Sequence, residues 1–202
     1  MLFVNRNRLV KNITLFFLEK DDKILKNTGN FVHFGVNFMN NIILIGMPAV
    51  GKSTIGVLLA KTLILSFTDT DLLIQEKYKK SLCDIIKDNG TNAFLNIEED
   101  VILNTDFENT VIATGGSAVF GENAMKKLKM SGKVIYLSLP MDEIKKRIGD
   151  IKSRGVVLTN GTTVDDIFEE RKPLYEKYAD VKIDCSNLTA EECVEKIISR
   201  VK

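Results

Sequence analysis

The stretch Gly46-Met47-Pro48-Ala49-Val50-Gly51-Lys52-Ser53 follows an apolar run at 41–45 and precedes a helical pattern at 54–61. A strand, a glycine-rich loop and a helix in this order predict a phosphate-binding loop. The backbone N–H groups of residues 49–53 would point at a phosphate, whose charge the helix dipole favours. Lys52 would reach the β and γ phosphates and the Ser53 hydroxyl would bind Mg²⁺. The alternative is a plain turn between a strand and a helix.

Size and composition predict one globular domain. The chain has 202 residues, of which 45% are hydrophobic and 27% charged. Its net charge of +1 provides no field for a nucleic acid, and no apolar run approaches the roughly 20 residues that span a bilayer. The three cysteines, Cys83, Cys185 and Cys193, have no metal-ligand spacing, which favours reduced packing residues. We expect a soluble, cytoplasmic monomer that binds neither nucleic acid nor membrane.

Residues 1–38 differ in composition from the rest. They hold six of the eleven phenylalanines, the only histidine, and six basic against three acidic side chains. Three interpretations compete: a targeting peptide, a docking extension, or sequence upstream of a start at Met39. We expect this extension to lie outside the fold, and residues 39–202 to form the nucleotide-binding domain.

From residue 41 onward, β-rich runs alternate with helical patterns. This alternation predicts an α/β fold with a five-stranded parallel sheet flanked by helices. Strands are expected at 41–46, 66–69, 110–114, 133–138 and 181–185. Helices are expected at 52–63, 71–79, 81–88, 92–104, 122–130, 141–148, 164–178 and 189–201, with Ser81 and Thr163 as N-caps and with Met125 and Met130 in the core. The long glycine-punctuated segment 149–162 is expected to be a lid loop.

Two aspartates are candidates for the chemistry of phosphoryl transfer. Asp69 and Asp71 lie at the carboxyl end of the second strand, where ligands bind in open α/β sheets. Alternate residues of a strand share a side, so the pair can face the nucleotide together. In the plainer interpretation, Asp71 is the N-cap of the next helix. Because residues 41–202 contain no histidine, the proton of the acceptor must go to a carboxylate or to the phosphate.

Glycines and arginines supply the remaining candidates. Gly115 and Gly116 follow the third strand and would let the backbone approach a ligand closely, although a double glycine is more often a simple turn. Arg147 and Arg154 flank the start of the lid, and Arg171 lies in a helix expected to face the site. Each arginine could equally be an ordinary surface residue.

The chain from about residue 41 to 200 resembles the shikimate kinases, which are small P-loop kinases of the nucleoside-monophosphate-kinase type. The resemblance is carried by Gly46 to Thr54, Phe67-Thr68-Asp69-Thr70-Asp71, Phe94 with Ile97-Glu98-Glu99, Val111-Ile112-Ala113-Thr114-Gly115-Gly116, Val134-Ile135-Tyr136-Leu137, and Arg171-Lys172-Pro173-Leu174-Tyr175 running on to Asp184. It implies ATP and Mg²⁺ as cofactors and transfer of the γ-phosphoryl group to a ring hydroxyl of shikimate.

The resemblance also implies roles for individual residues. Nucleotide binding would fall to Gly46, Ala49, Val50, Gly51, Lys52, Ser53, Thr54, Arg147 and Arg154, with Arg147 near the adenine and Arg154 reaching the phosphates from the lid. Ser53 and Asp69 would hold the metal ion, Asp69 through water. Shikimate would contact Asp71 through its hydroxyls, Gly115 and Gly116 through its ring edge, and Arg171 through its carboxylate. Lys52, Asp71 and Arg154 would be catalytic.

The chain departs from the family pattern at three places. An arginine that grips the shikimate carboxylate together with Arg171 is replaced by Leu95, which offers a carboxylate nothing. The phosphate loop has Ala49-Val50 where glycine and a small residue are usual. The lid has Gly155-Val156-Val157 after its arginine, where the family has a proline and two leucines.

Three functions follow from these observations. The favoured function is a kinase that acts on shikimate. A kinase of the same architecture for another small hydroxylated metabolite is the alternative that Leu95 raises. A non-catalytic nucleotide-binding module is the third, and the set of Lys52, Ser53, Asp69, Asp71 and Arg154 argues against it, since such a module has no use for an aspartate on the acceptor side.

Overall fold

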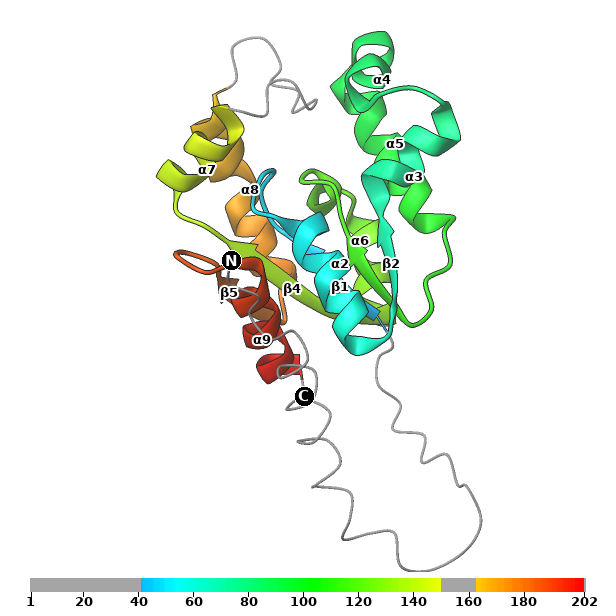
Figure 1. The fold of residues 1–202 in the computed structure, drawn as a ribbon. Coiled ribbons are helices and arrows are strands. Elements are labelled where there is room, and N and C mark those ends of the chain that lie inside the picture. Colours follow the sequence, from blue (N-terminus) through cyan, green and yellow to red (C-terminus); the bar gives the residue numbers. More distant parts are fainter. Residues whose placement is uncertain (1–40, 150–162, 202) are drawn as a thin grey trace, which may run out of the picture. The chain divides into compact units, whose positions relative to one another are not determined.

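The computed structural model describes residues 41–149 and 163–201, which belong to one compact unit, Asn37–Lys202 (Figure 1). The predictions for residues 1–38 lie outside the described residues. Of the predicted lid, 149–162, the structure describes only Gly149, which is the last residue of a helix.

Five parallel strands form the sheet, as the sequence predicted. They are β1 (Asn41–Ile45), β2 (Ser66–Asp69), β3 (Thr110–Ala113), β4 (Gly132–Ser138) and β5 (Val181–Asp184), in the order β2-β3-β1-β4-β5. In the centre of the sheet Leu44 pairs with Ala113 on one side and Ile135 on the other. Since β1 is the central strand and is buried along its whole length, the loop that follows it starts from inside the core.

Eight α-helices and one short 3-10 helix are formed by the described residues. They are α2 (Lys52–Leu63), α3 (Thr70–Tyr78), α4 (Leu82–Asn89), α5 (Thr91–Leu103), η1 (Ala118–Phe120), α6 (Glu122–Ser131), α7 (Met141–Gly149), α8 (Val164–Tyr178) and α9 (Ala190–Val201). Every expected strand and α-helix is confirmed with ends within one residue; η1 was not predicted.

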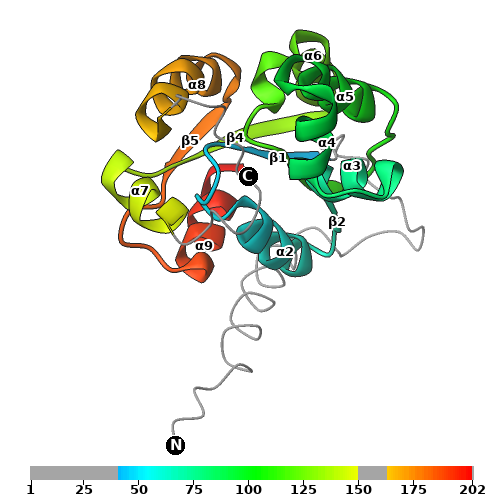
Figure 2. The same cartoon turned by 90° about the horizontal axis from the view of Figure 1, so that it is seen from above.

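Helices cover both faces of the sheet. Figure 2 shows α2 and α9 on one face and α5, α6 and α8 on the other. The helix that follows the phosphate loop lies very close to the sheet, because a Cβ atom on Gly56 would be only 2.6 Å from the Phe67 ring. A residue larger than glycine at position 56 would therefore push α2, and the loop before it, away from the sheet.

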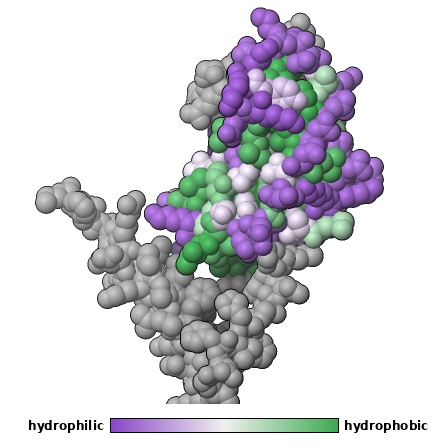
Figure 3. All heavy atoms as spheres, turned by 90° about the vertical axis from the view of Figure 1, so that its right-hand side faces the viewer, coloured by the Kyte–Doolittle hydropathy of each residue, from purple (hydrophilic) through white to green (hydrophobic). Residues whose placement is uncertain are grey.

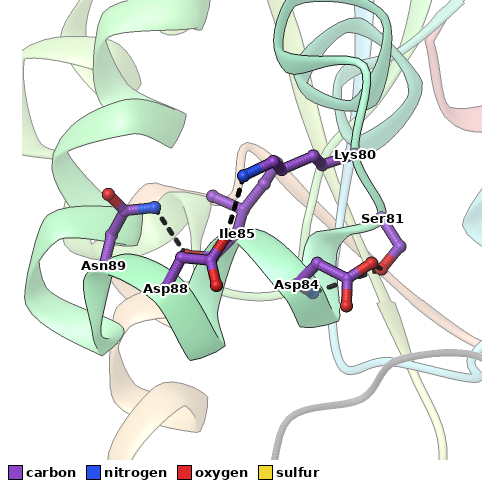
Figure 4. Close-up of polar contacts among 6 residues, drawn as sticks. All are labelled: Lys80, Ser81, Asp84, Ile85, Asp88 and Asn89. Atoms are coloured by element: carbon purple, nitrogen blue, oxygen red, sulfur yellow. Dashed lines mark hydrogen bonds and ion pairs between the residues drawn. The ribbon is translucent and has the colours of Figure 1, made fainter.

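The predicted helix caps are present. The Ser81 hydroxyl accepts a hydrogen bond from the Asp84 N–H at the start of α4 (Figure 4). Thr163 and Asp166 form a reciprocal capping box at the start of α8. The interpretation of Asp71 as a cap is wrong: Asp69 caps α3 by accepting a 3.0 Å hydrogen bond from the Asp71 N–H. The Asp71 carboxylate is thus left available for other contacts.

Helices α3, α4 and α5 pack around a small apolar cluster of their own, separate from the main core. Its buried members are Ile74, Ile85, Phe94 and Val101. The face shown in Figure 3 mixes hydrophilic and hydrophobic residues. Leu72 of α3 and Leu103 of α5 are among the exposed apolar residues of the protein. Scattered exposed apolar residues of this kind are ordinary for a globular surface.

Two packing predictions need correction. Met125 is fully buried, but Met130 is 84% exposed, because five residues along a helix turn the side chain well away from the face that buries Met125 and Leu128. Cys185 and Cys193 are buried as expected, whereas Cys83 is exposed, since α4 turns only Ile85 fully inward.

Candidate active site

The phosphate loop connects the end of β1 to the first turn of α2. Gly46 has a φ of 142°, and a Cβ atom there would lie 2.4 Å from the carbonyl oxygen of Leu137, so only glycine is accommodated. Gly51, with a φ of 103°, precedes α2. Ala49 takes the left-handed region at φ 66°, which costs about 1 kcal/mol for an L-residue. Val50 is buried, so the two unusual loop residues are accommodated in a compact turn.

Lys52 lies within the loop rather than extending into solvent. Its Nζ donates hydrogen bonds of 2.8 and 2.9 Å to the carbonyl oxygens of Gly46 and Met47. Burial lowers the pKa of Lys52 to about 8, although the nearby carboxylates of Asp71 and Asp69 favour its charged form. Among the described residues Lys52 forms no ion pair, so it is a buried cation that can bind an anionic group.

Ser53 and Asp69 meet at the end of the sheet. The Ser53 hydroxyl donates a 2.6 Å hydrogen bond to Asp69 Oδ2, so the first turn of α2 contacts the end of β2. A hydroxyl and a carboxylate are the hard oxygen donors that Mg²⁺ prefers. Within residues 41–149 and 163–201, no group of three or more His, Cys, Asp or Glu could hold a metal ion. This donor set suits an ion that takes its other ligands from water and phosphate.

Asp71 lies in the first turn of α3, beside this pair. Burial and, to a smaller extent, the neighbouring charge of Asp69 raise the pKa of Asp71 to about 6, against the opposing effect of Lys52. At neutral pH the carboxyl is therefore mostly ionised but more basic than an ordinary aspartate, which suits a group that accepts a proton from a hydroxyl.

The turn after β3 forms the opposite wall. The Gly115 N–H donates to the Thr70 hydroxyl at 3.0 Å, and the Gly116 carbonyl accepts a 2.6 Å hydrogen bond from the Tyr175 hydroxyl. A Cβ atom on Gly115 would lie 2.7 Å from Asp71 Oδ1, and one on Gly116 would lie 3.0 Å from Arg171 Nη1. The two glycines thus let a carboxylate and a guanidinium approach the same short backbone segment.

A pocket adjoins the phosphate loop on the side of α7 and α9. It has a volume of about 220 Å³ and is lined in part by Thr54, Arg147 and Cys185. Arg147 Nη1 donates to the carbonyl oxygen of Ala49 at 3.5 Å and also pairs with Glu143. The position next to the phosphate loop is suitable for a nucleotide base. Arg154 is outside the described residues.

Comparison with known proteins assigns the family. The shikimate kinase family model matches residues 48–202. The chain belongs to the shikimate kinase family. A shikimate kinase from Thermodesulfovibrio yellowstonii is 37% identical over 163 residues, covering 79% of this chain and 94% of the relative. One from Clostridium botulinum is 38% identical over 161 residues, covering 78% and 94%.

Solved structures of shikimate kinases have the same fold. The enzyme from Acinetobacter baumannii in complex with shikimate superposes with a TM-score of 0.74 at 29% identity, over 80% of this chain and 92% of that one. The enzyme from Aquifex aeolicus gives 0.69 at 32% identity, over 79% and 94%. The five-stranded parallel architecture expected from the sequence is therefore that of the shikimate kinase family.

Glu98 is part of the motif that resembles the family, but the sequence alone predicts no role for it. Its carboxyl group is buried beside Gly115, where a Cβ atom would meet Glu98 Oε1 at 2.1 Å. Burial raises the pKa of Glu98 to about 7, even though the hydrogen bond from Ser117 favours the ionised form. The signal was in the sequence: Glu98 occupies the apolar stripe that Phe94, Val101 and Ile102 form on α5, where an acidic residue is out of place.

Leu95 lies on the same helix, one turn before Glu98. It is half-buried, and it belongs to neither apolar cluster of the described residues. The departure from the family pattern is therefore not a substitution within a packed core.

Proposed function

We propose that this protein transfers the γ-phosphoryl group of ATP to a ring hydroxyl of shikimate, forming 3-phosphoshikimate. The observation that carries the proposal is the juxtaposition of the phosphate side and the acceptor side. A Cβ atom on Gly115 would lie 2.7 Å from Asp71 Oδ1, and one on Gly116 would lie 2.9 Å from Pro48 of the phosphate loop, so Asp71 and the loop that holds Lys52 adjoin the same short turn. The charge of Asp71 also favours the charged form of Lys52. A phosphate held by Lys52 and a hydroxyl held by Asp71 would thus be neighbours, as an in-line transfer requires.

On the phosphate side, the backbone N–H groups of residues 49–53 and the α2 N-terminus bind the phosphates, and Lys52 stabilises negative charge that develops during transfer. Ser53 and Asp69 would hold Mg²⁺, Asp69 through water. When bound, the ion neutralises phosphate charge. Gly46 and Thr54 complete the nucleotide-binding segment, with Arg147 at the base. Arg154 would add a cation from the lid.

On the acceptor side, Asp71 accepts the proton of the attacking hydroxyl and fixes its orientation. Gly115 and Gly116 contact the edge of the ring, and Arg171 pairs with the carboxylate of shikimate. Arg171 is held over the Phe120 ring, 5.6 Å from its centroid, and its Nε has no hydrogen-bond partner among the described residues. A guanidinium with an unpaired, buried donor gains most from an anionic ligand.

A kinase for another small hydroxylated metabolite is the second candidate. It is favoured by Leu95, because a carboxylate gripped by one arginine instead of two is bound less tightly. A non-catalytic nucleotide-binding module is disfavoured by the basic carboxylate of Asp71 beside Lys52.

The test is ADP release with MgATP and a panel of acceptors. Shikimate is compared with other hydroxy acids and with polyols that lack a carboxylate, and Lys52→Ala serves as the inactive control. We expect shikimate to give the highest kcat/KM, with a raised KM. If a preparation shown to bind ATP releases no ADP with millimolar shikimate but turns over a polyol, the second candidate is correct.

The proposal also covers the extent of the catalytic domain, its location in the cell and its oligomeric state. We propose that residues 39–202 suffice for activity, with the lid at 149–162, and that the enzyme is a cytoplasmic monomer. None of the helices in residues 41–149 and 163–201 has the length and apolar composition to cross a membrane. Equal kcat and melting temperature for residues 39–202 and for the whole chain would support the assignment of the extension.

A further inference from the structure

Glu98 is the only fully buried acidic residue in the described part of the chain, with 1% of its surface exposed. A buried carboxylate requires hydrogen-bond partners for both of its oxygens. Glu98 Oε2 accepts a 2.6 Å hydrogen bond from the Ser117 hydroxyl, whereas Oε1 has no partner among the described residues. Half of this buried carboxylate is therefore available to a ligand.

The free oxygen faces the acceptor site. If Gly115 carried a Cβ atom, that atom would lie 2.1 Å from Glu98 Oε1 and 2.7 Å from Asp71 Oδ1, so the two carboxylate oxygens are close to each other beside Gly115. Arg171 Nη1 approaches the neighbouring Gly116, but no ion pair of 4 Å or less joins Arg171 to Glu98 among the described residues. Two carboxylate oxygens and a guanidinium thus line one short backbone segment. Of these, Glu98 Oε1 can still accept a hydrogen bond from a ligand.

Charged groups reach this carboxyl from three helices. Asp71 comes from α3, Arg171 from α8 and Lys52 from α2, and each acts on Glu98 through its charge. On α5 itself, the neighbour at the i−3 position is Leu95, which brings neither a charge nor a donor. The Ser117 hydroxyl is left as the one hydrogen-bond donor that fixes the Glu98 side chain within the described residues.

We propose that Ser117 is a positioning residue for the acceptor, whose hydroxyl holds Glu98 so that Oε1 receives a hydroxyl of the substrate, and that this role is coupled to the uncharged Leu95. The proposal rests on the function proposed above. The backbone of Ser117 has an ordinary φ of −96°, so substitutions there need not strain the turn. The hydroxyl is the important part of Ser117. A charged side chain at position 95 would hold Glu98 in place, and the neutral hydrogen bond from Ser117 does so instead.

Kinetics with Ser117→Ala and Ser117→Thr give the first test. Losing a hydrogen bond to a charged group should lower kcat/KM for shikimate roughly tenfold or more in Ser117→Ala. The KM for ATP should not change, because Ser117 lies on the acceptor side. Ser117→Thr keeps the hydroxyl and should retain most of the activity. Equal kcat/KM for shikimate in Ser117→Ala and the unchanged protein would overturn the proposal.

A double-mutant cycle with Leu95→Arg separates positioning from a merely structural role. If a guanidinium at position 95 fixes Glu98, Ser117→Ala should cost much less kcat/KM in the Leu95→Arg background than alone. Equal losses in the two backgrounds would show that the residues act independently, and the coupling would be refuted.

The pKa of Glu98 can be followed without any substrate. Carbon NMR of the labelled, ligand-free protein, with Glu98→Gln to assign the signal, should show a higher pKa in Ser117→Ala, because the hydroxyl stabilises the ionised form. An unchanged pKa would contradict the positioning role. If the unchanged protein fails to phosphorylate shikimate while this shift is observed, the proposed substrate is wrong and the role of Ser117 stands.

Discussion

Ser53 Oγ donates a 2.6 Å hydrogen bond to Asp69 Oδ2, which joins the first turn of the phosphate-loop helix to the end of β2. A second serine–aspartate pair of the same length, from Ser81 to Asp84, lies on the exposed helix α4 (Figure 4). The two pairs share their chemistry and differ in location, so the second is a matched control for the first.

Asp69→Asn should weaken the use of Mg²⁺ without unfolding the protein. Asparagine still caps α3 but lacks the charge that attracts the ion. We expect the half-saturating Mg²⁺ concentration to rise and kcat/KM for MgATP to fall by roughly tenfold to a hundredfold. The measurement is a magnesium titration of turnover. Asp84→Asn should have no effect on it, and an equal effect of both variants would contradict the role of Asp69.

Lys52→Ala should reduce turnover at least roughly a hundredfold to a thousandfold, since a cation aimed at transition-state charge is lost. Stability should not suffer. The folded pKa of about 8 lies below the ordinary 10.5, so the charged lysine destabilises the fold below pH 8, and stability recovers as pH rises from 8 toward 10.5. Denaturant melts over this range should show a rise in the unchanged protein that Lys52→Ala lacks. Undiminished single-turnover rates would refute the assignment.

Leu95→Arg tests the acceptor directly. A second guanidinium beside Arg171 should lower the KM for shikimate roughly tenfold to a hundredfold, the equivalent of about 1.5 to 3 kcal/mol for a charged hydrogen bond. Since Leu95 is only half-buried and lies outside both apolar clusters, the longer side chain need not enter a core. A lower melting temperature together with reduced native activity would instead indicate a pocket shaped for another acceptor.

Glu98→Gln should remove a specific pH dependence of stability. The folded pKa of about 7 lies above the ordinary 4.5, so between these values the folded state binds more protons and stability falls as pH rises. The difference in unfolding free energy between the unchanged protein and Glu98→Gln should therefore decline by up to about 3 kcal/mol from pH 4.5 to 7. Urea melts at several pH values measure it. A difference that is constant with pH would show that Glu98 is not the titrating group.

Periodicity and turn chemistry predicted the fold well because each element carries its own signal. The helix α8 is an example: Thr163 and Asp166 set its start, and its length follows from an amphipathic pattern that continues through Pro173. Met130 shows the limit, since a methionine in a helical pattern is ambiguous until the orientation of the helix toward the sheet is known. That orientation depends on the tertiary structure.

The candidate site was predicted unevenly, for a similar reason. Lys52, Ser53 and Asp69 follow from one contiguous motif and from the rule that ligands bind where parallel strands end. The pairing of Ser117 with Glu98 could not be predicted, because it joins residues 19 positions apart on different elements. Glu98 itself could have been suspected from an acidic residue in an apolar stripe. Its oxygens and their partners required three-dimensional contacts.

The helices on the acceptor side of the enzyme pack around the small cluster of Ile74, Ile85, Phe94 and Val101, which has far fewer buried residues than the main core. Glu98 lies between two of these residues on α5, whereas the phosphate loop extends from β1 in the main core. Elements with few buried contacts open at lower free energy, so amide hydrogens of α3, α4 and α5 should exchange faster than those of β1. Acceptor binding should slow exchange in these helices, and nucleotide binding should slow it around α2. Each substrate would then stabilise a different cooperative unit of the same chain.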